Sequence, residues 1–237
     1  KVPPMGYRIY RLIRRSSSDA PAVSDADNHE ASSSVYTIEN DRFRVQIEPR
    51  QGAVSSIFDK QIGRDLLLAD SDATESLFNY LVSQTPITPE KVETRLVEGK
   101  TFKRLEIRRP STWFPETEIR LTDGVDYVEL RNVFDRQEWK RLHPAEGGMH
   151  GRIAMPFAIP PSKAKLYVSG PNGYRQIPAD LFPHSIRDSW ASSAFVALSD
   201  GERTVMVSAP ADFIFSPMGP WEPTTTATQP YFPLSTQ

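Results

Sequence analysis

The dominant pattern of the chain is a strict alternation of apolar and polar residues, which is typical of β-strands with one buried face. In FRVQIE, residues 43–48, Phe43, Val45 and Ile47 alternate with polar side chains. The same two-residue period recurs at 105–108, 119–121, 125–133, 153–157, 165–168, 194–198 and 204–208. Because successive side chains of a strand point to opposite faces, the pattern predicts strands nearly throughout the chain from Val35 onward.

Proline content argues against long helices. The chain of 237 residues has 21 prolines, about 9% against a typical ~5%. Proline removes a hydrogen-bond donor and clashes with the preceding helical turn, so prolines spread along a chain block long helices. Only RDLLLADSDATESLFNYLV, residues 64–82, has a helical character. Roughly ten to fourteen strands are expected, too many for one flat sheet. The predicted fold is therefore all-β, a large antiparallel β-sandwich.

The stretch VQIEPRQGAVSSIFDKQIGRDLL, residues 45–67, predicts consecutive strands joined by tight turns. Four residues are expected to enter a sheet-on-sheet core, namely Val45, Ile47, Val54 and Ile57. Gly52 is expected to supply the first turn, and residues 59–64 a corner at the surface. In LSDGERTVMVSA, the pair Asp200-Gly201 predicts the tight turn of a hairpin.

Three regions follow from these patterns. Residues 1–15 contain a short alternation at 7–10 and predict a first strand. Residues 16–34, SSSDAPAVSDADNHEASSS, have almost no large apolar side chains. They cannot bury enough surface to offset the entropy lost on ordering, so they predict a flexible loop or linker. Residues 35–237 form the predicted large β-sandwich domain.

Charge and composition exclude several classes of protein. The 28 basic and 30 acidic residues give a net charge of -2, which argues against a nucleic-acid-binding protein. The basic clusters at 11–15 and 104–109 are interpreted as solvated strand faces and ends. No run approaches the roughly 20 apolar residues of a membrane helix, and no signal peptide is visible, so a soluble chain is expected. Cysteine is absent, which excludes disulfides and leaves the compartment open.

The sequence offers no clear catalytic or metal-binding motif. His143, Glu146 and His150 share the loop HPAEGGMHG, but their spacing matches neither a helical zinc pair nor a zinc finger. A solvated or hydrogen-bonding loop is favoured over a metal site there. Carboxylates are abundant, yet no spacing selects a pair for glycoside chemistry. No nucleophile elbow, P-loop or dinucleotide-binding glycine pattern is present, so no catalytic residue or metal ligand is assigned.

Aromatic residues near loops are the candidate binding groups. The four tryptophans all lie near loop signals: Trp113, Trp139, Trp190 and Trp221. Tryptophan rings stack on sugar rings, while arginine and aspartate form bidentate hydrogen bonds with hydroxyls. The candidate substrate-binding residues are therefore Arg187, Asp188 and Trp190 in HSIRDSW, with Trp221 in GPWEP. For these residues, and for Trp139, the competing role of packing on the core or tying loops to it is favoured over sugar contact.

Four stretches, in order, resemble the C-terminal region of glycoside hydrolase family 38, the retaining α-mannosidases. VPPMGYRIYRL resembles the stretch that closes a small β-domain of that family, and IENDRFRVQIEPRQGAVSSIFDKQIGRDLL resembles the start of its large β-domain. YVELRNVFDRQEWKRLH with RIAMPFAIP resembles a strand and Trp-rich turn, and DSWASSAFVALSDGERTVMVSAPADFIF resembles a later hairpin. The long insert at 16–34 and the Pro-rich tail from Pro217 depart from the family pattern.

The resemblance implies a galactose-mutarotase-like supersandwich within a parent enzyme that hydrolyses α-mannosides with retention. It implies that the nucleophilic aspartate and a zinc ion belong to an N-terminal catalytic domain. No nucleophile or zinc ligand is therefore transferred to this chain. Lys1 and the stretch after it are expected to lie in the middle of a longer protein. The expected partners are the catalytic domain of the same polypeptide and a mannoside.

Two other functions remain open from the residues. The first is a free-standing carbohydrate-binding β-sandwich with affinity of its own, which an exposed, coplanar pair of tryptophans would favour. The second is a mutarotase-like sugar enzyme acting alone, which requires a histidine and a glutamate on a concave face. His143, His150 and His184 are available for that role, but all three lie in predicted loops.

Overall fold

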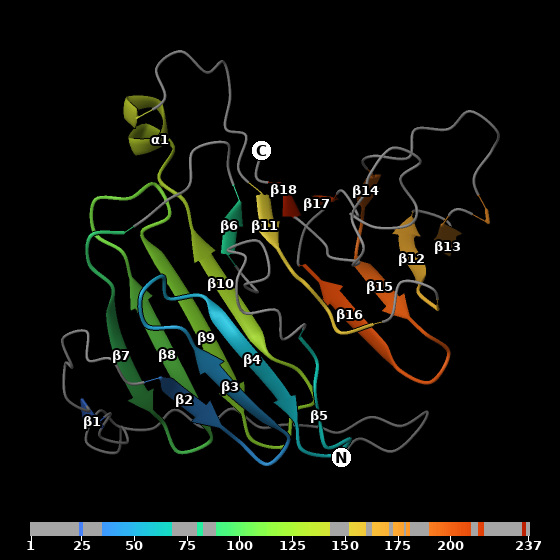
Figure 1. Cartoon of the computed structure of the whole chain (residues 1–237), viewed down its shortest axis with the longest axis horizontal. Coiled ribbons are helices and arrows are strands. Elements are labelled where there is room, and N and C mark those ends of the chain that lie inside the picture. The colour runs from blue at the N-terminus through green and yellow to red at the C-terminus, as the bar shows by residue number, and fades with distance from the viewer. Residues whose placement is uncertain are drawn as a thin grey trace, which may run out of the picture.

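The structure, a computed structural model, describes eleven stretches of the chain. These are residues 24–25, 35–67, 80–82, 89–142, 152–159, 163–170, 173–177, 179–180, 190–209, 213–215 and 234–235. Strands dominate these residues, and they contain one short helix, α1 (Arg136–Leu142). Figure 1 shows the strands gathered into sheets, with α1 at one margin of the molecule. The predicted all-β fold, an antiparallel β-sandwich, is confirmed.

The first sheet follows the chain order without crossovers. Its strands are β2 (Tyr36–Glu39), β3 (Phe43–Ile47), β4 (Val54–Asp59) and β5 (Arg64–Asp65), and neighbours in sequence are neighbours in the sheet. All pairs are antiparallel, with a bulge between Gln46 and Ile47. The buried face carries the residues predicted for it, Val45, Ile47, Val54 and Ile57. Gly52 makes the turn between β3 and β4 with a φ of 68°.

The second sheet lies against the first. Its order is β1 (Ser24–Asp25), β7 (Glu93–Glu98), β8 (Phe102–Arg108), β9 (Glu116–Thr122) and β10 (Glu129–Val133), all antiparallel. Leu105, Ile107, Ile119 and Leu121 point inward and are fully buried. They pack with the inner residues of the first sheet into one apolar core. Two antiparallel sheets with a shared core form the sandwich.

Asn40 joins the two sheets at the start of β3. Its side-chain oxygen accepts hydrogen bonds from the N–H groups of Arg42 at 3.0 Å and Phe43 at 2.6 Å. Its side-chain amide donates to the carbonyl oxygen of Thr122, at the end of β9, at 2.9 Å. One side chain therefore closes a local turn and contacts the second sheet.

Two further antiparallel sheets complete the described part of the chain. One has the order β13 (Gly173–Ile177), β12 (Lys165–Gly170), β15 (Phe195–Ser199) and β16 (Thr204–Ser208). The other has the order β14 (Trp190–Ser192), β17 (Phe213–Phe215), β18 (Leu234–Ser235), β11 (Arg152–Ala154) and β6 (Tyr80–Val82). Leu166, Val196 and Leu198 from the first of these belong to the same buried cluster as the sandwich core. The core is therefore continuous from β2 to β15.

The helical prediction for residues 64–82 is wrong at both ends of that segment. Residues 64–65 form β5 and residues 80–82 form β6, because each pairs with a neighbouring strand. Residues 68–79 lie outside the described part. The helix lies instead at α1, within a segment interpreted as a strand and turn. Asp135 caps it, accepting hydrogen bonds from the N–H groups of Gln137 and Glu138 at 2.9 and 3.0 Å.

The predicted regions at the start of the chain are only partly described. Residues 1–15 lie outside the described residues, as do all but two of residues 16–34. Ser24 and Asp25 form β1, which pairs with Glu98 and Val97 of β7. Part of the predicted linker is therefore a strand at the edge of the second sheet.

No helix in the described ranges is long and apolar enough to cross a membrane.

Candidate functional site

Of the four sugar-binding residues predicted from sequence, only Trp190 lies in the described part of the chain, so their sugar-binding role stays a prediction. Arg187, Asp188 and Trp221 lie outside the described residues. Trp190 begins β14, where its backbone pairs with Phe215 of β17. The loop with His143, Glu146 and His150 is also outside the described part. Elsewhere in the described ranges, no group of three or more histidines, cysteines or acidic residues is arranged to hold a metal ion.

Two tryptophans form part of the core. Trp113 and Trp139 are 1% and 3% exposed, and their rings meet edge to face with centroids 4.3 Å apart at 75°. Phe134 lies 6.3 Å from Trp113 and stacks on Phe114 at 5.1 Å. This cluster holds α1 against the sandwich, so the core role favoured for Trp139 is confirmed.

The candidate site is a groove between β9 and β10 on one side and β16 on the other. It has a volume of about 690 Å³, within the range of roughly 300–1,000 Å³ typical of ligand sites. β10 is the last strand of the second sheet, and β16 is the last strand of the sheet that contains β15. The groove therefore lies where two sheet edges face each other, and Figure 1 shows both strands near the middle of the molecule.

The charged residues of the groove come from the outward-facing positions of β9 and β10. Cross-strand register puts Glu118 opposite Arg131 and Arg120 opposite Glu129. The intervening residues, Ile119 among them, point into the core. The two-residue period of a strand thus places two arginines and two glutamates on one face, and all four line the groove.

The ion pairs along the groove are long. Nε of Arg120 lies 3.5 Å from Oε2 of Glu129, and Nη1 of Arg131 lies 3.8 Å from Oε2 of Glu118. On the same sheet face but outside the groove lining, Nη2 of Arg104 donates to Oε1 of Glu106 at 2.6 Å. The shielded Nε of Arg120 has no hydrogen-bond partner among the described residues. The long groove pairs therefore retain hydrogen-bonding capacity, as does Arg104, whose Nε also lacks a hydrogen-bond partner among the described residues.

An exposed tyrosine lines the groove. A turn at Asp123 and Gly124, where Gly124 has a φ of 71°, separates β9 from the segment that leads into β10. Tyr127 follows that turn, is 57% exposed and lines the groove. The local sequence therefore presents an aromatic ring beside the charged pairs.

Aliphatic groups complete the lining. Val128 and Leu130 are half-buried and pack against the core, so only part of each faces the groove. On the opposite wall, Met206 is 60% exposed and Ser208 lies two residues further along β16. Alternation puts these two side chains on one face of β16 and Val205 and Val207 on the core side. The groove thus combines apolar surface with groups that donate and accept hydrogen bonds.

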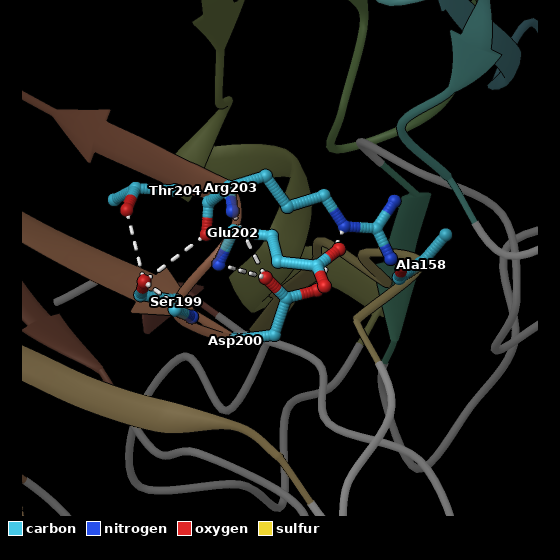
Figure 2. A network of polar contacts seen from close by, with 7 residues as sticks. Ala158, Ser199, Asp200, Glu202, Arg203 and Thr204 are labelled. Carbon is cyan, nitrogen blue, oxygen red and sulfur yellow. Dashed lines mark hydrogen bonds and ion pairs between the residues drawn. The ribbon is translucent and has the colours of Figure 1, made fainter.

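A polar network fixes the hairpin that carries β16. Figure 2 shows the turn between β15 and β16, where Oδ1 of Asp200 accepts from the N–H groups of Glu202 and Arg203 at 3.0 and 2.9 Å. Nε of Arg203 donates to Oδ2 of Asp200 at 3.0 Å, and its Nη2 donates to the carbonyl oxygen of Ala158. The N–H of Arg203, with its guanidinium and the N–H of Glu202 adding to the effect, lowers the pKa of Asp200 to about 2. The predicted turn at Asp200 and Gly201 is confirmed.

Sequence reasoning missed the groove. Its signal was present in the alternating charges of 118–120 and 129–131 and in a tyrosine directly after a turn. Those patterns also describe any solvated strand face. Only the position of β16, far along the chain, turns that face into the floor of a groove.

No model of a known protein family matches the chain, and no curated protein matches it significantly in sequence. Any assignment to a family therefore rests on the residues quoted above.

Proposed function

We propose that this chain is the C-terminal β-sandwich module of a retaining α-mannosidase and has the galactose-mutarotase-like supersandwich fold. In this role it packs against the catalytic domain of the same polypeptide and walls the cleft that binds the mannoside. The proposal rests on four family-38-like stretches in order within an all-β chain. The observation that carries it is the corner between β4 and β5, built by the residues of the most extended of those stretches.

Asp59 is the central residue of that corner. It is 4% exposed, and Oδ1 accepts hydrogen bonds from the N–H groups of Gln61 at 2.9 Å and Ile62 at 3.3 Å. Nη2 of Arg42 donates to its Oδ2 at 2.8 Å. A carboxylate with this many donors is held in one orientation. Asp59, the aspartate of DKQIGR in that stretch, thus has a structural role that requires a carboxylate.

The neighbouring residues of the pattern act in the same way. Nζ of Lys60 donates to the carbonyl oxygen of Asn40 at 2.6 Å. This bond connects the corner to the start of the same stretch, IEN at residues 38–40. Gly63 has a φ of 66°, a conformation that glycine adopts without steric cost. These residues explain why a stretch without reactive groups has a defined pattern: it fixes how β2 to β5 enter the sandwich.

The chemistry of the proposed enzyme belongs to the catalytic domain. The resemblance assigns the nucleophilic aspartate and the zinc ligands to that domain. No described group of three or more acidic or histidine residues of this chain fits a zinc site. Since the resemblance places that chemistry in the catalytic domain, the proposal assigns no catalytic residue to this chain.

The test is hydrolysis of 4-nitrophenyl α-D-mannopyranoside by the complete polypeptide of which this chain is the C-terminal part. We expect turnover, with the α-anomer as the first product seen by proton NMR. A variant that ends before residue 35 is expected to lose most of the soluble, active enzyme. Absence of mannoside hydrolysis by the complete polypeptide would contradict the proposal, as would full activity without residues 35–237.

A matched pair of variants tests the non-catalytic role within the same polypeptide. Asp59→Ala is expected to lower the yield of active enzyme while leaving kcat per active site, determined by active-site titration, unchanged. Asp126→Ala, which removes an exposed carboxylate, is expected to change neither quantity. A fall in kcat per active site for Asp59→Ala would assign that residue to the reaction and overturn the module's supporting role.

A further inference from the structure

We propose that the groove between β10 and β16 is a binding site for neutral pyranosides, with Tyr127 as its stacking platform. This inference goes beyond the proposed function, because it gives the chain an affinity for carbohydrate that needs no catalytic domain. The evidence for this inference comes only from the described residues that line the groove.

The charge of the lining indicates a neutral ligand. Two arginines and two glutamates line the groove, so their formal charges cancel. A phosphorylated or otherwise anionic ligand is favoured by a basic excess, which this lining lacks. A purely apolar ligand would remove water from four charged side chains and offer no hydrogen bonds in place of those that the water made. A neutral ligand rich in hydroxyls avoids both costs.

The ion pairs supply what sugar hydroxyls require. A hydroxyl both donates and accepts a hydrogen bond, so a ring with several hydroxyls is best met by donors and acceptors that alternate. Arg120 beside Glu129 and Arg131 beside Glu118 provide that alternation on neighbouring strands. Because these pairs are 3.5 and 3.8 Å apart, each has hydrogen-bonding positions left for a ligand.

Tyr127 and Met206 supply the apolar contacts. A pyranose ring has a face of C–H groups that packs on an aromatic ring, and an aromatic face exposed at a turn is accessible for that contact. Tyr127 is 57% exposed on one wall and Met206 is 60% exposed on the other. A ring between the two walls buries both of its faces against side chains that are otherwise in water.

The dimensions of the groove suit more than one ring. Its volume of about 690 Å³ is near the middle of the range of roughly 300–1,000 Å³ found for small-molecule sites. The groove runs between two strand edges, so it extends along the strands and suits a linear oligosaccharide. An extended peptide pairing with an edge strand is the other occupant that such a geometry admits; the experiment distinguishes the two.

The experiment is calorimetric and NMR titration of the 237-residue chain with methyl α-D-mannopyranoside and an α-linked mannotriose. A Ser/Thr-rich peptide of eight residues serves as the competing probe. We expect saturable binding of the trisaccharide, tighter than that of the monosaccharide, and no binding of the peptide. Because the sugar is neutral, the Kd is expected to change less than twofold between 0.05 and 0.5 M NaCl, roughly a threefold change in screening length.

Matched variants locate the binding. Tyr127→Ala is expected to raise the Kd about tenfold, which is roughly 1.4 kcal/mol, and Arg131→Ala about fivefold. The controls are Tyr174→Ala and Arg175→Ala on β13, where Tyr174 is 69% exposed and both side chains lie outside the groove. Each control is expected to change the Kd less than twofold.

Several outcomes overturn the inference. These are no saturable binding of either sugar at millimolar concentration, equal losses for Tyr127→Ala and Tyr174→Ala, and preferential binding of the peptide. Unfolding curves check that each variant is folded; Tyr127→Phe, which keeps the ring, is then expected to bind within threefold of the wild type. Because the titration uses this chain alone, its failure leaves the mannosidase proposal unaffected, and an inactive complete polypeptide leaves sugar binding unaffected.

Discussion

Nη2 of Arg109 donates a hydrogen bond to the carbonyl oxygen of Gly52 at 2.7 Å, and through this contact the two sheets of the sandwich are joined at the β3–β4 turn. Arg109 is 3% exposed. Its Nε donates to the carbonyl oxygen of Gln51 at 2.8 Å and its Nη1 to Oγ1 of Thr117 at 3.0 Å. The guanidinium also lies 4.7 Å from the ring centre of Phe114. A buried guanidinium thus satisfies carbonyl groups that the turn leaves without strand partners.

The close approach of Gly52 to the second sheet makes it intolerant of a side chain. A Cβ at this position would lie 2.5 Å from Cγ2 of Ile107 and 3.1 Å from Nη2 of Arg109. Gly52→Ala is expected to combine a left-handed backbone penalty of about 1–2 kcal/mol with about 1–3 kcal/mol of overpacking. Urea unfolding of the variant measures the loss.

Gly63→Ala is the matched control for that variant. Gly63 has nearly the same φ, 66° against 68°, but a Cβ there meets open space. Only the backbone penalty of about 1–2 kcal/mol is expected. Equal losses for the two variants would show that contact with Ile107 and Arg109 adds nothing.

Removing the buried carboxylate of Asp59 is expected to be costly. Asp59→Ala leaves the guanidinium of Arg42 and two backbone N–H groups without their acceptor. The expected loss in free energy of unfolding is about 3 kcal/mol, the scale for breaking a buried pair. Asp126→Ala, at an exposed site, is expected to stay within about 0.5 kcal/mol of the wild type. A loss of similar size in both variants would contradict the role of the corner.

The lowered pKa of Asp200 leads us to expect that the folded chain loses stability in acid. Its pKa is about 2 in the folded chain against 3.8 as the reference value. Since the folded state lowers the pKa, the charged carboxylate stabilises the fold above about pH 4, and that contribution disappears as the pH falls from 4 to 2. Asp200→Asn should therefore be less stable than the wild type at pH 7, with the difference shrinking between pH 4 and 2. Unfolding curves across that range measure it.

Asp123→Asn is the control for the acid effect, because Asp123 also precedes a glycine at a turn but is exposed. Asp123→Asn is expected to change the acid dependence of stability less than Asp200→Asn does. A pH-dependent difference for Asp123→Asn as large as that for Asp200→Asn would remove the Arg203 network as the cause.

The capping residue of α1 offers a smaller, local prediction. Asp135→Ala removes the acceptor for two N–H groups of the first helical turn and is expected to cost about 1 kcal/mol. Asp135→Ser keeps a capping oxygen and is expected to recover most of that loss. Equal stability of the alanine and serine variants, measured by urea unfolding, would show that the cap contributes little.

The fold was predictable from sequence because its signals are local. Alternation over 43–47 and 204–208, and the turns at Gly52 and Gly201, depend only on neighbouring residues and are confirmed. The corner at 59–64 was expected at the surface, and residues 61–64 are exposed. Asp59 itself is buried, since it pairs with Arg42. The helix α1 was missed for a similar reason. It has only seven residues and depends on packing of Trp139 against Trp113, which no short window of sequence reveals.

The candidate groove needed information of longer range. Its floor comes from β9 and β10 and its far wall from Met206 and Ser208 of β16. A pattern of alternating charges fixes which side chains face outward, but not which other strand edge lies opposite them. Three of the residues chosen from sequence, Arg187, Asp188 and Trp221, lie outside the described part, so their sugar-binding role stays a prediction.

The three side-chain hydrogen bonds of Asn40 bear on the order in which the chain folds. Its contacts with Arg42 and Phe43 span two and three residues, whereas its contact with Thr122 spans 82. Closing a long loop costs more entropy than closing a short one, so the local turn forms first. The strands β2 to β5 are also neighbours in sequence order, which makes their pairing fast. We therefore expect the turn of Asn40 and the pairing of β2 to β5 to form before the hydrogen bond from Asn40 to Thr122 of β9 does.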